Sequence, residues 1–364
     1  MEFICNRDDL LNGLNVAQKA ITKKSTLNIL EGVYIQGNEE GITLLGNDLE
    51  MGCMYKIKGV VKRYGELCLH AKIFTDIVRK LRADEVHINV EGDRAFISSG
   101  NTNLQLQTMP AEQYPKLEYT LEDCLVTLEQ AQLKRALKGS LFALGINEMR
   151  PVFTGVKFLL SDHLLTVLAM DGYKIAIRKE NSDFEGEKEF IVPGRTLIEL
   201  LKILEEEGDI QIYSTLKQVI FKTAKLTLTS RLLEVNSVDY KQFIFDDPLT
   251  KVTVAANDLV NLIETASAFI LNGQNTNVPL VLEIKDQRIW VKCQSVFGNI
   301  EDYIGCKAYG QPLKIGFNYR YLLETIRACD TEFITLFFKD NRTHCMVTPM
   351  EGETYVYITA PVII

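Results

Sequence analysis

Apolar and polar residues alternate with a period of two in many short segments of this chain. Residues 86–90 (VHINV) and 219–223 (VIFKT) are examples, and such alternation is typical of half-buried β-strands. Hairpin turns are predicted at residues 91–93, 161–163 and 285–287, which separate segments of this kind. Strands joined by short turns pair antiparallel, so the pattern predicts antiparallel sheets.

A second pattern, with apolar residues three and four positions apart, predicts two helices in each third of the chain. The opening helices are expected at residues 8–21, 129–144 and 257–270, and the second helices at 74–81, 197–204 and 321–328. Landmark residues recur as well: Gly32 corresponds to Gly155, and Asp48 to Asp171, at the same spacing. The third copy matches the other two more loosely.

These repeats predict an α+β protein with three similar domains, because the chain is too long for one ordinary core. We expect domain borders at 1–119, 120–250 and 251–364. The period of about 120 residues is far longer than the roughly 20–50 residues of stacked solenoid motifs. The repeats are therefore whole domains.

The net charge of −8 argues at first against a nucleic-acid partner. Net charge is only a sum, however, and a single basic face is enough to contact phosphates. Helix 129–144 places Lys134, Arg135 and Lys138 opposite its buried leucines. Lysines on exposed helix faces are also common as plain solvated residues, so the pattern alone leaves both interpretations open. The opening helix of the third repeat adds little positive charge.

The remaining composition narrows the class of protein. Apolar residues make up 46% and charged residues 24%, which is ordinary for a globular protein. There is no signal-peptide pattern and no apolar run near the roughly 20 residues that span a bilayer, so we expect a cytoplasmic protein without a membrane partner. The eight cysteines are scattered without a CxxC pair, which favours free thiols over a metal site.

Motifs of catalysis are missing from the sequence. We find no GxGxxG, no Walker loop, no HExxH and no GxSxG, and the four histidines are dispersed. We therefore expect no catalytic residue, no cofactor and no metal. A rival interpretation is an α+β enzyme or binding protein that uses the cleft of its second domain for a small molecule.

Five motifs, in order along the chain, resemble the DNA polymerase III beta subunit family of bacterial sliding clamps. They are residues 24–32 (KSTLNILEG), 46–50 (GNDLE), 108–115 (TMPAEQYP), 169–176 (AMDGYKIA) and 355–362 (YVYITAPV). The second resembles the family's TDLE segment, the third its MPAEEYP, the fourth its ATDGHRLA and the fifth its YVYLIMPV. The resemblance covers the whole chain.

The resemblance implies a head-to-tail homodimer whose six domains close a ring, with sheets outside and helices lining the hole. Such a ring encircles double-stranded DNA without reading its sequence. The family's DNA-facing positions, together with the basic helix face described above, give the candidates Lys24, Lys72, Arg150, Arg195, Lys134 and Lys138. The family's dimer interface falls near Phe74, Met109, Ile270 and Leu271, and each of these has a core role as its alternative.

The resemblance also implies a groove for short peptides of the replicative polymerase, the clamp loader and repair proteins. By position its residues are Phe153, Met170, Gly172, Tyr173, Lys174, Ile175, Val238, Gln242, Phe243, Ile358, Thr359, Ala360, Pro361, Val362 and Ile363. Lys174 would place a cation at the rim. The alternative is structural: residues 170–173 also read as a plain type I′ hairpin turn, and Phe243 and Ile358 as core.

Several groove positions depart from the family's usual residues. Met170 replaces Thr, Lys174 replaces Arg, Val238 replaces Pro, Gln242 replaces Arg and Ala360 replaces Met. The departures predict a reshaped groove with a different peptide preference. They also leave open a divergent clamp paralogue in place of the principal replicative clamp.

Overall fold

The structure is a computed structural model of the 364-residue chain. It describes residues 1–22, 27–117, 119, 121, 123–145, 150–236, 238–271, 279–295 and 298–364, without the side chains of 269–271 and 293–295. The chain forms two compact units. Unit 1 contains Met1–Ala131 and Lys202–Leu232, and unit 2 contains Gln132–Leu201 and Leu233–Ile364.

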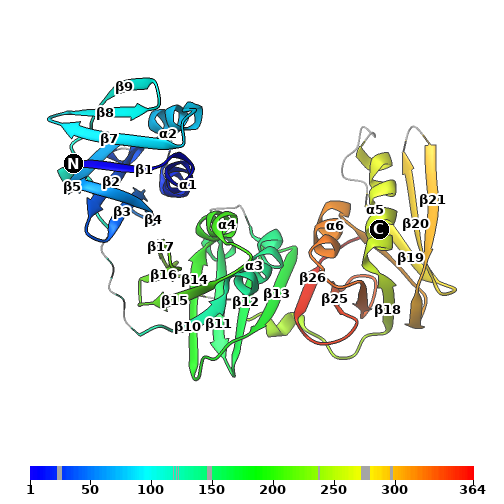
Figure 1. Cartoon of the computed structure of the whole chain (residues 1–364). Helices are drawn as coiled ribbons and strands as arrows, with labels where there is room; N and C mark the ends of the chain where they lie inside the picture. The colour runs from blue at the N-terminus through cyan, green and yellow to red at the C-terminus, as the bar shows by residue number, and fades with distance from the viewer. Residues whose placement is uncertain are drawn as a thin grey trace. The chain divides into compact units, whose positions relative to one another are not determined.

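Unit 1 holds two antiparallel sheets (Figure 1). The five-stranded sheet has the order β5 (Gly59–Arg63), β1 (Glu2–Asn6), β7 (Glu85–Glu91), β8 (Arg94–Ser99) and β9 (Thr102–Gln107). The eight-stranded sheet has the order β10 (Val126–Glu129), β15 (Asp209–Ser214), β16 (Gln218–Lys222), β17 (Leu226–Arg231), β4 (Met51–Ile57), β3 (Gly41–Asn47), β2 (Gly32–Asn38) and β6 (Gly65–His70).

Unit 2 holds the other two sheets, which are again antiparallel. The nine-stranded sheet has the order β14 (Glu187–Pro193), β11 (Gly155–Ser161), β12 (Leu164–Met170), β13 (Lys174–Asn181), β26 (Tyr355–Thr359), β25 (Cys345–Pro349), β24 (Phe333–Phe338), β18 (Thr250–Ala255) and β22 (Lys307–Gly310). The second five-stranded sheet has the order β21 (Gly298–Gly305), β20 (Arg288–Ser295), β19 (Leu280–Lys285), β23 (Leu313–Phe317) and β27 (Pro361–Val362).

The six predicted helices are confirmed, two in each repeat. They are α1 (Arg7–Ala17), α2 (Ala71–Lys80), α3 (Gln130–Lys138), α4 (Gly194–Ile203), α5 (Ala256–Leu271) and α6 (Tyr319–Arg327). Asparagine caps fix two of their starts: Asn6 accepts a bond from the backbone N–H of Asp8, and Asn318 from that of Arg320.

The prediction of one continuous helix over 129–144 is wrong, because α3 ends at Lys138. A short 3₁₀ turn, Leu141–Ala143, follows it. Gly139 stands where the chain passes the Tyr357 hydroxyl so closely that a Cβ would lie 2.7 Å from it. Ser140 then returns its hydroxyl to the carbonyl of Ala136, at 2.9 Å, so that the buried hydroxyl is satisfied.

The predicted hairpin turns are also confirmed. Asp162 and His163 join β11 to β12, and Asp286 and Gln287 join β19 to β20, all with positive φ as a type I′ turn requires. The turn between β12 and β13 differs from its predicted type I′ form, because Gly172 is its only residue with a positive φ. The Asp171 carboxylate stabilises this turn by accepting bonds from the backbone N–H groups of Tyr173 and Lys174.

Two strand pairs join neighbouring repeats into continuous sheets. In unit 1, β4 of the first repeat pairs with β17 of the second, from Met51↔Ser230 to Tyr55↔Leu226. In unit 2, β13 of the second repeat pairs with β26 of the third, from Lys174↔Thr359 to Arg178↔Tyr355. The repeats are therefore connected by backbone hydrogen bonds as well as by the chain itself.

Buried charges reinforce the second of these junctions. The Arg178 side chain is 3% exposed, and its two Nη atoms donate to both oxygens of Asp330 at 3.0 and 2.5 Å. Glu180 on the same strand lies 3.5 Å from Arg178 and accepts two further bonds from Arg135 of α3. Burial alone would raise the pKa of the Asp330 carboxyl, but its bonds to Arg178 outweigh burial and lower it.

We predict that Asp330→Asn lowers the free energy of unfolding by about 2 kcal/mol, because it leaves the buried Arg178 without its main counter-charge. The effect falls below the 3–5 kcal/mol of a fully buried pair, since the Asp330 side chain is 41% exposed. Urea denaturation measures it. The matched control is Asp247→Asn in the exposed pair with Lys339, which should change stability by less than about 0.5 kcal/mol.

The Asp330→Asn effect should also depend on pH. A carboxyl whose pKa is lowered by folding stabilises the protein above its unfolded pKa and loses that contribution as pH falls through the folded value. The difference between wild type and variant should therefore be full at neutral pH and shrink below about pH 4. A difference that grows on acidification would contradict the pairing.

Candidate partner-binding site and nucleic-acid interface

An apolar cluster lies on one face of the nine-stranded sheet of unit 2. Its buried members are Leu168, Met170, Ile175, Ile177, Met346 and Ile358. Half-buried residues that pack against them are Phe153, Val238, Tyr240, Phe243, Phe245, Phe337 and Val356. The structure thus brings together six of the predicted groove residues, which come from segments more than 200 residues apart in sequence.

Strand register explains why these side chains meet. Met170 pairs with Ile175, Ile175 with Ile358, and Ile358 with Met346, so their side chains form one row across β12, β13, β26 and β25. Phe153 precedes β11 and lies near Gly172, whose missing Cβ would be 3.7 Å from the Phe153 ring. Gly172 is required by its φ of +93° rather than by lack of space.

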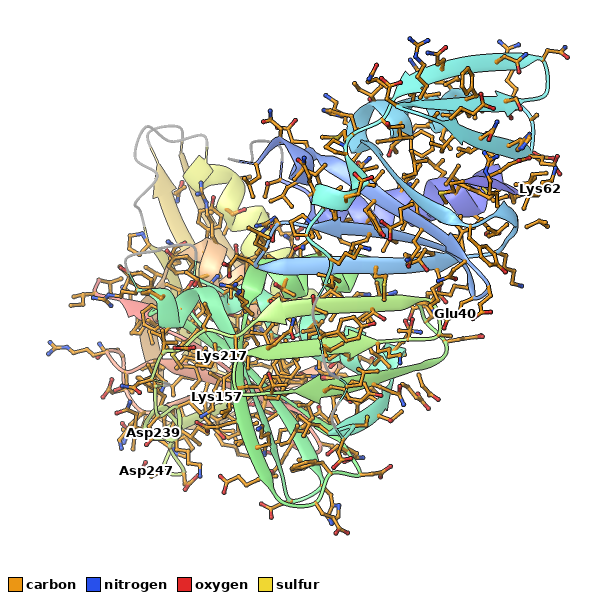
Figure 2. The ribbon with its side chains drawn as sticks, turned by 90° about the vertical axis from the view of Figure 1, so that its left-hand side faces the viewer. Glu40, Lys62, Lys157, Lys217, Asp239 and Asp247 are labelled. Carbon is orange, nitrogen blue, oxygen red and sulfur yellow. The ribbon has the colours of Figure 1, made fainter. Side chains whose placement is uncertain are left out.

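The segment 238–247 forms one wall of this cluster. His344 Nε2 lies 2.6 Å from the carbonyl oxygen of Phe243, and its ring packs against those of Phe243 and Phe245. Asp239 and Asp247, both labelled in Figure 2, hold the ends of the segment. Asp239 accepts from the Lys241 backbone N–H, and Asp247 pairs with Lys339 at 3.2 Å.

Lys174 and Thr359 face the opposite side of the sheet from this cluster. Successive residues of a strand point to opposite faces, so Lys174 and its partner Thr359 lie behind Ile175 and Ile358. That rear face carries helices, because Lys174 contacts α6 and Tyr357 contacts the turn after α3. The Thr359 side chain is fully buried there.

The expectation that Lys174 supplies a cation at the groove rim is wrong. The residue is 5% exposed, and its Nζ donates to Glu324 at 2.5 Å and to the Phe142 carbonyl at 2.7 Å. Asp171 lies 3.5 Å away, and the Tyr321 ring covers the ammonium at 5.2 Å. Lys174 therefore holds α6 against β13.

The other predicted groove residues are more accessible. Tyr173 is 59% exposed and stacks on Tyr321, and Gln242 is also exposed. The C-terminal segment leaves β26 at Ala360, whose backbone N–H donates to the Tyr173 carbonyl at 2.8 Å. It then crosses to the second five-stranded sheet, where Pro361 and Val362 pair with β23, and exposes Ile363.

The described basic candidates lie at helix starts and on helix surfaces. Lys72 is the second residue of α2 and Arg195 the second residue of α4, and both are exposed. On α3, Lys138 is exposed and Lys134 half-buried, whereas the neighbouring Arg135 is neutralised by Glu180. The Arg150 guanidinium covers the Phe153 ring at 5.9 Å, beside the apolar cluster. Lys24 lies outside the described residues.

The dimer-interface candidates differ in how far the structure shows their side chains buried. Phe74 is fully buried in the core of its own chain, so its core alternative holds and it offers no surface to a second copy. Met109 is half-buried beside Tyr34, and its backbone bridges to Cys68. The side chains of Ile270 and Leu271 lie outside the described part of the chain. The sequence pattern did not reveal that β9 and β21 are edge strands of the two five-stranded sheets.

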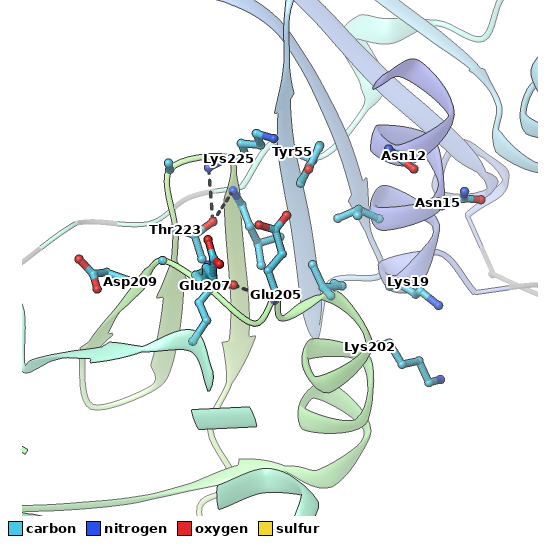
Figure 3. Close-up of a pocket in the computed structure, with 16 residues that line it drawn as sticks. Asn12, Asn15, Lys19, Tyr55, Lys202, Glu205, Glu207, Asp209, Thr223 and Lys225 are labelled. Atoms are coloured by element: carbon cyan, nitrogen blue, oxygen red, sulfur yellow. Dashed lines mark hydrogen bonds between the residues drawn. The ribbon is translucent and has the colours of Figure 1, made fainter. Parts of the chain in front are cut away.

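A polar cavity of about 590 Å³ lies in unit 1, between α1 and the segments around β15 and β17 (Figure 3). Its wall contains both cations and carboxylates, namely Lys19, Lys202, Lys225, Glu205, Glu207 and Asp209. The charges are balanced, and the cavity does not select one class of charged ligand. It shares no residue with the apolar cluster.

Three cysteine thiols are unreactive in this structure. Burial raises the pKa of the Cys5, Cys68 and Cys329 thiols to about 12, so that these three stay protonated at neutral pH and are poor nucleophiles. Among the residues that the structure describes, no group of three His, Cys, Asp or Glu side chains is placed to hold a metal ion. No helix in this described set is long and apolar enough to cross a bilayer.

Three antiparallel α+β repeats, joined by shared sheets, define a protein of the repeated clamp-domain class. Profiles of the DNA polymerase III beta subunit match throughout: the N-terminal domain at residues 1–118, the central domain at 127–237 and the C-terminal domain at 241–363. The chain belongs to the DNA polymerase III beta subunit family.

Individual relatives agree with this assignment over their full lengths. The beta sliding clamp of Halalkalibacterium halodurans is 29% identical, with 100% of this chain and 99% of the relative covered. The crystal structure of the DNA polymerase sliding clamp from Bacillus subtilis is 26% identical with a TM-score of 0.95, covering 100% of this chain and 99% of that one. The DNA polymerase III beta chain from Streptococcus pneumoniae is 26% identical with a TM-score of 0.93 and full coverage of both chains.

We predict that Lys174→Met lowers the free energy of unfolding by about 1–3 kcal/mol, because it removes a buried donor from Glu324, Asp171 and the Phe142 carbonyl. Thermal and urea unfolding both measure the effect. The matched control is Lys241→Met, an exposed lysine of the 238–247 wall, which should stay within about 0.5 kcal/mol of wild type. Equal stabilities for the two variants would show that Lys174 is not a structural cation.

Proposed function

We propose that this protein is a DNA sliding clamp, a processivity factor that encircles duplex DNA and tethers the replicative polymerase to it. The observation that carries the proposal is the family match, which extends over all three repeats without a missing part. In this function the protein binds and performs no catalytic step, and loading on DNA requires a separate clamp loader. We retain 1–119, 120–250 and 251–364 as its three clamp domains.

Two open sheet edges support ring closure by a second copy. The outer strand β9 ends the five-stranded sheet of unit 1, and β21 ends that of unit 2. An edge strand carries unpaired N–H and C=O groups that can bind another strand. Pairing β9 of one copy with β21 of another joins two different surfaces, and two such contacts close a head-to-tail ring of six domains with its helices inside.

The basic helix residues support a sequence-independent contact with DNA. In the proposed ring, Lys72, Lys134, Lys138, Arg150 and Arg195 approach phosphates, and Lys24 is proposed with them on the resemblance alone. Contacts to phosphates fix position without reading bases, which suits a protein that slides. A net charge of −8 is compatible with this function, because phosphate attraction acts only near the basic face.

The apolar cluster supports peptide binding by polymerase, clamp-loader and repair proteins. Phe153, Val238 and Phe243 are half-buried around a fully apolar floor, an arrangement that anchors one or two peptide side chains. Two floor residues are the flexible Met170 and Met346, which adapt to different anchors. The departures from the family's usual groove residues, Met170 among them, keep a divergent paralogue with other peptide partners as the second candidate function.

A topological assay tests the proposed function. After loading by the organism's clamp loader, the protein should remain on nicked circular DNA for many minutes and leave quickly once the circle is linearised, because a closed ring escapes only over an end. Gel filtration of the DNA complex measures retention. Equal loss from circular and linear DNA would rule out encirclement, and a protein that is monomeric when loaded would contradict ring closure.

A peptide titration tests the apolar cluster. Phe243→Ala should weaken binding of a clamp-binding peptide from the organism's own replicative polymerase at least tenfold, which is about 1.4 kcal/mol, by removing an anchor contact. Fluorescence polarisation measures the affinity. Phe333→Ala is the matched control, since Phe333 lies on the same sheet outside the cluster and is 41% exposed. A similar loss of affinity in both variants would mean that the peptide does not bind at the apolar cluster.

A further inference from the structure

The three repeats place a basic residue at the same position of their second helices. Gly32 pairs with His70 at the end of β6, and Gly155 with Pro193 at the end of β14. In the third repeat the last pair of β19 and β23 is Leu280↔Phe317. One further residue, the N-cap Asn318, stands between this pair and the start of α6. The second helical residues are therefore Lys72, Arg195 and Arg320.

The sequence alone leaves the equivalent position in the third repeat at either Tyr319 or Arg320. The motif of the third repeat carries no Gly or Pro at its end, and nothing in the letters fixes its alignment to within one residue. The burial pattern removes the ambiguity: the last residues of β6 and β23 are buried up to Leu69 and Phe317, and His70 and Asn318 after them are half-buried, so that Arg320 corresponds to Lys72. Arg320 is exposed, as Lys72 and Arg195 are.

The Arg320 side chain is held in place by its neighbour. Its Nε donates to the Tyr319 hydroxyl at 2.9 Å, and its guanidinium lies 5.6 Å from the centre of the Tyr319 ring. Tyr319 itself is 7% exposed and fixed in the core. The contact uses Nε and leaves the two Nη groups for a further acceptor, in the paired geometry that suits a phosphate.

The acidic residue nearest in sequence attracts this charge but, within the described part of the chain, forms no direct ion pair with it. Glu324 follows Arg320 by one helical turn, but its carboxylate accepts a bond from the buried Lys174. The other exposed arginine of α6, Arg327, is instead paired with Glu264 of α5. Within the described residues, the two arginines of α6 thus differ in that Arg327 forms a direct ion pair with a carboxylate, whereas Arg320 bonds to the Tyr319 hydroxyl.

We propose that Arg320 is a further phosphate-contacting residue, the equivalent in the third repeat of Lys72 and Arg195. The proposal rests on the proposed function, and it assigns one cation at an equivalent helix position to every clamp domain. The ring would then hold the DNA backbone by a repeated set of contacts. The third repeat would take part even though α5 exposes mainly Asn257, Asp258, Asn261 and Thr265.

The test measures the Kd of the protein for a short linear duplex, as a function of salt. No clamp loader is present, so that an effect on loading does not enter. Arg320→Gln should weaken binding about threefold and reduce the salt slope by about two counter-ions, one for each copy in the ring, as should Arg195→Gln. Arg327→Gln, the matched control, should leave both quantities unchanged. Arg320→Lys keeps the positive charge but lacks the two Nη groups, and its binding to DNA should lie between that of wild type and that of Arg320→Gln.

Circular dichroism and solution mass show whether each variant folds and dimerises as wild type does. If Arg320→Gln is misfolded, Arg320→Lys decides the matter by its Kd. Kd values and salt slopes equal to wild type for both Arg320 variants would overturn the proposal while Arg195→Gln still shows an effect, leaving the proposed function intact. If the loaded wild-type protein is not retained on circular DNA, both the proposed function and the role of Arg320 would be overturned.

Discussion

Backbone hydrogen bonding between repeats is the constraint on which the rest of this structure depends. The pairs β4–β17 and β13–β26 extend each sheet from one repeat into the next, so that neighbouring clamp domains share a sheet. A shared sheet fixes the register between repeats, and register decides which side chains point to which face. The ion pair of Arg178 with Asp330 and that of Lys174 with Glu324 then lock the third repeat against the second.

The two faces of the nine-stranded sheet carry different kinds of side chain. Residues such as Ile175, Ile358 and Met346 build the apolar cluster on one face, where we place the partner peptide. Lys174, Arg178 and Tyr357 alternate with them and hold α3 and α6 to the other face, where we place DNA. In this proposal the peptide and the DNA contact different side chains of the sheet, with Arg150 as the exception because its guanidinium lies over the Phe153 ring.

Periodicity predicted most of the fold, because the strands, the six helices and the hairpin turns at Asp162 and Asp286 are local features. The family resemblance, rather than periodicity, identified six residues of the apolar cluster. The resemblance misplaced Lys174 at the groove rim, because the face of a strand residue depends on strand pairing that the sequence does not state. The sequence did not single out Arg320, and it could not separate core from interface for Phe74, since both roles require the same apolar side chain.

Hydrogen exchange of backbone amides tests the central claim most directly. If shared sheets join the repeats, the paired amides of β4, β17, β13 and β26 should exchange as slowly as those of the β11–β12 hairpin, through global unfolding. The edge strand β22 should exchange much faster, because one of its sides has no strand neighbour. Exchange in β4 and β13 as fast as in β22 would mean that the repeats are linked only by the chain, and would contradict the account.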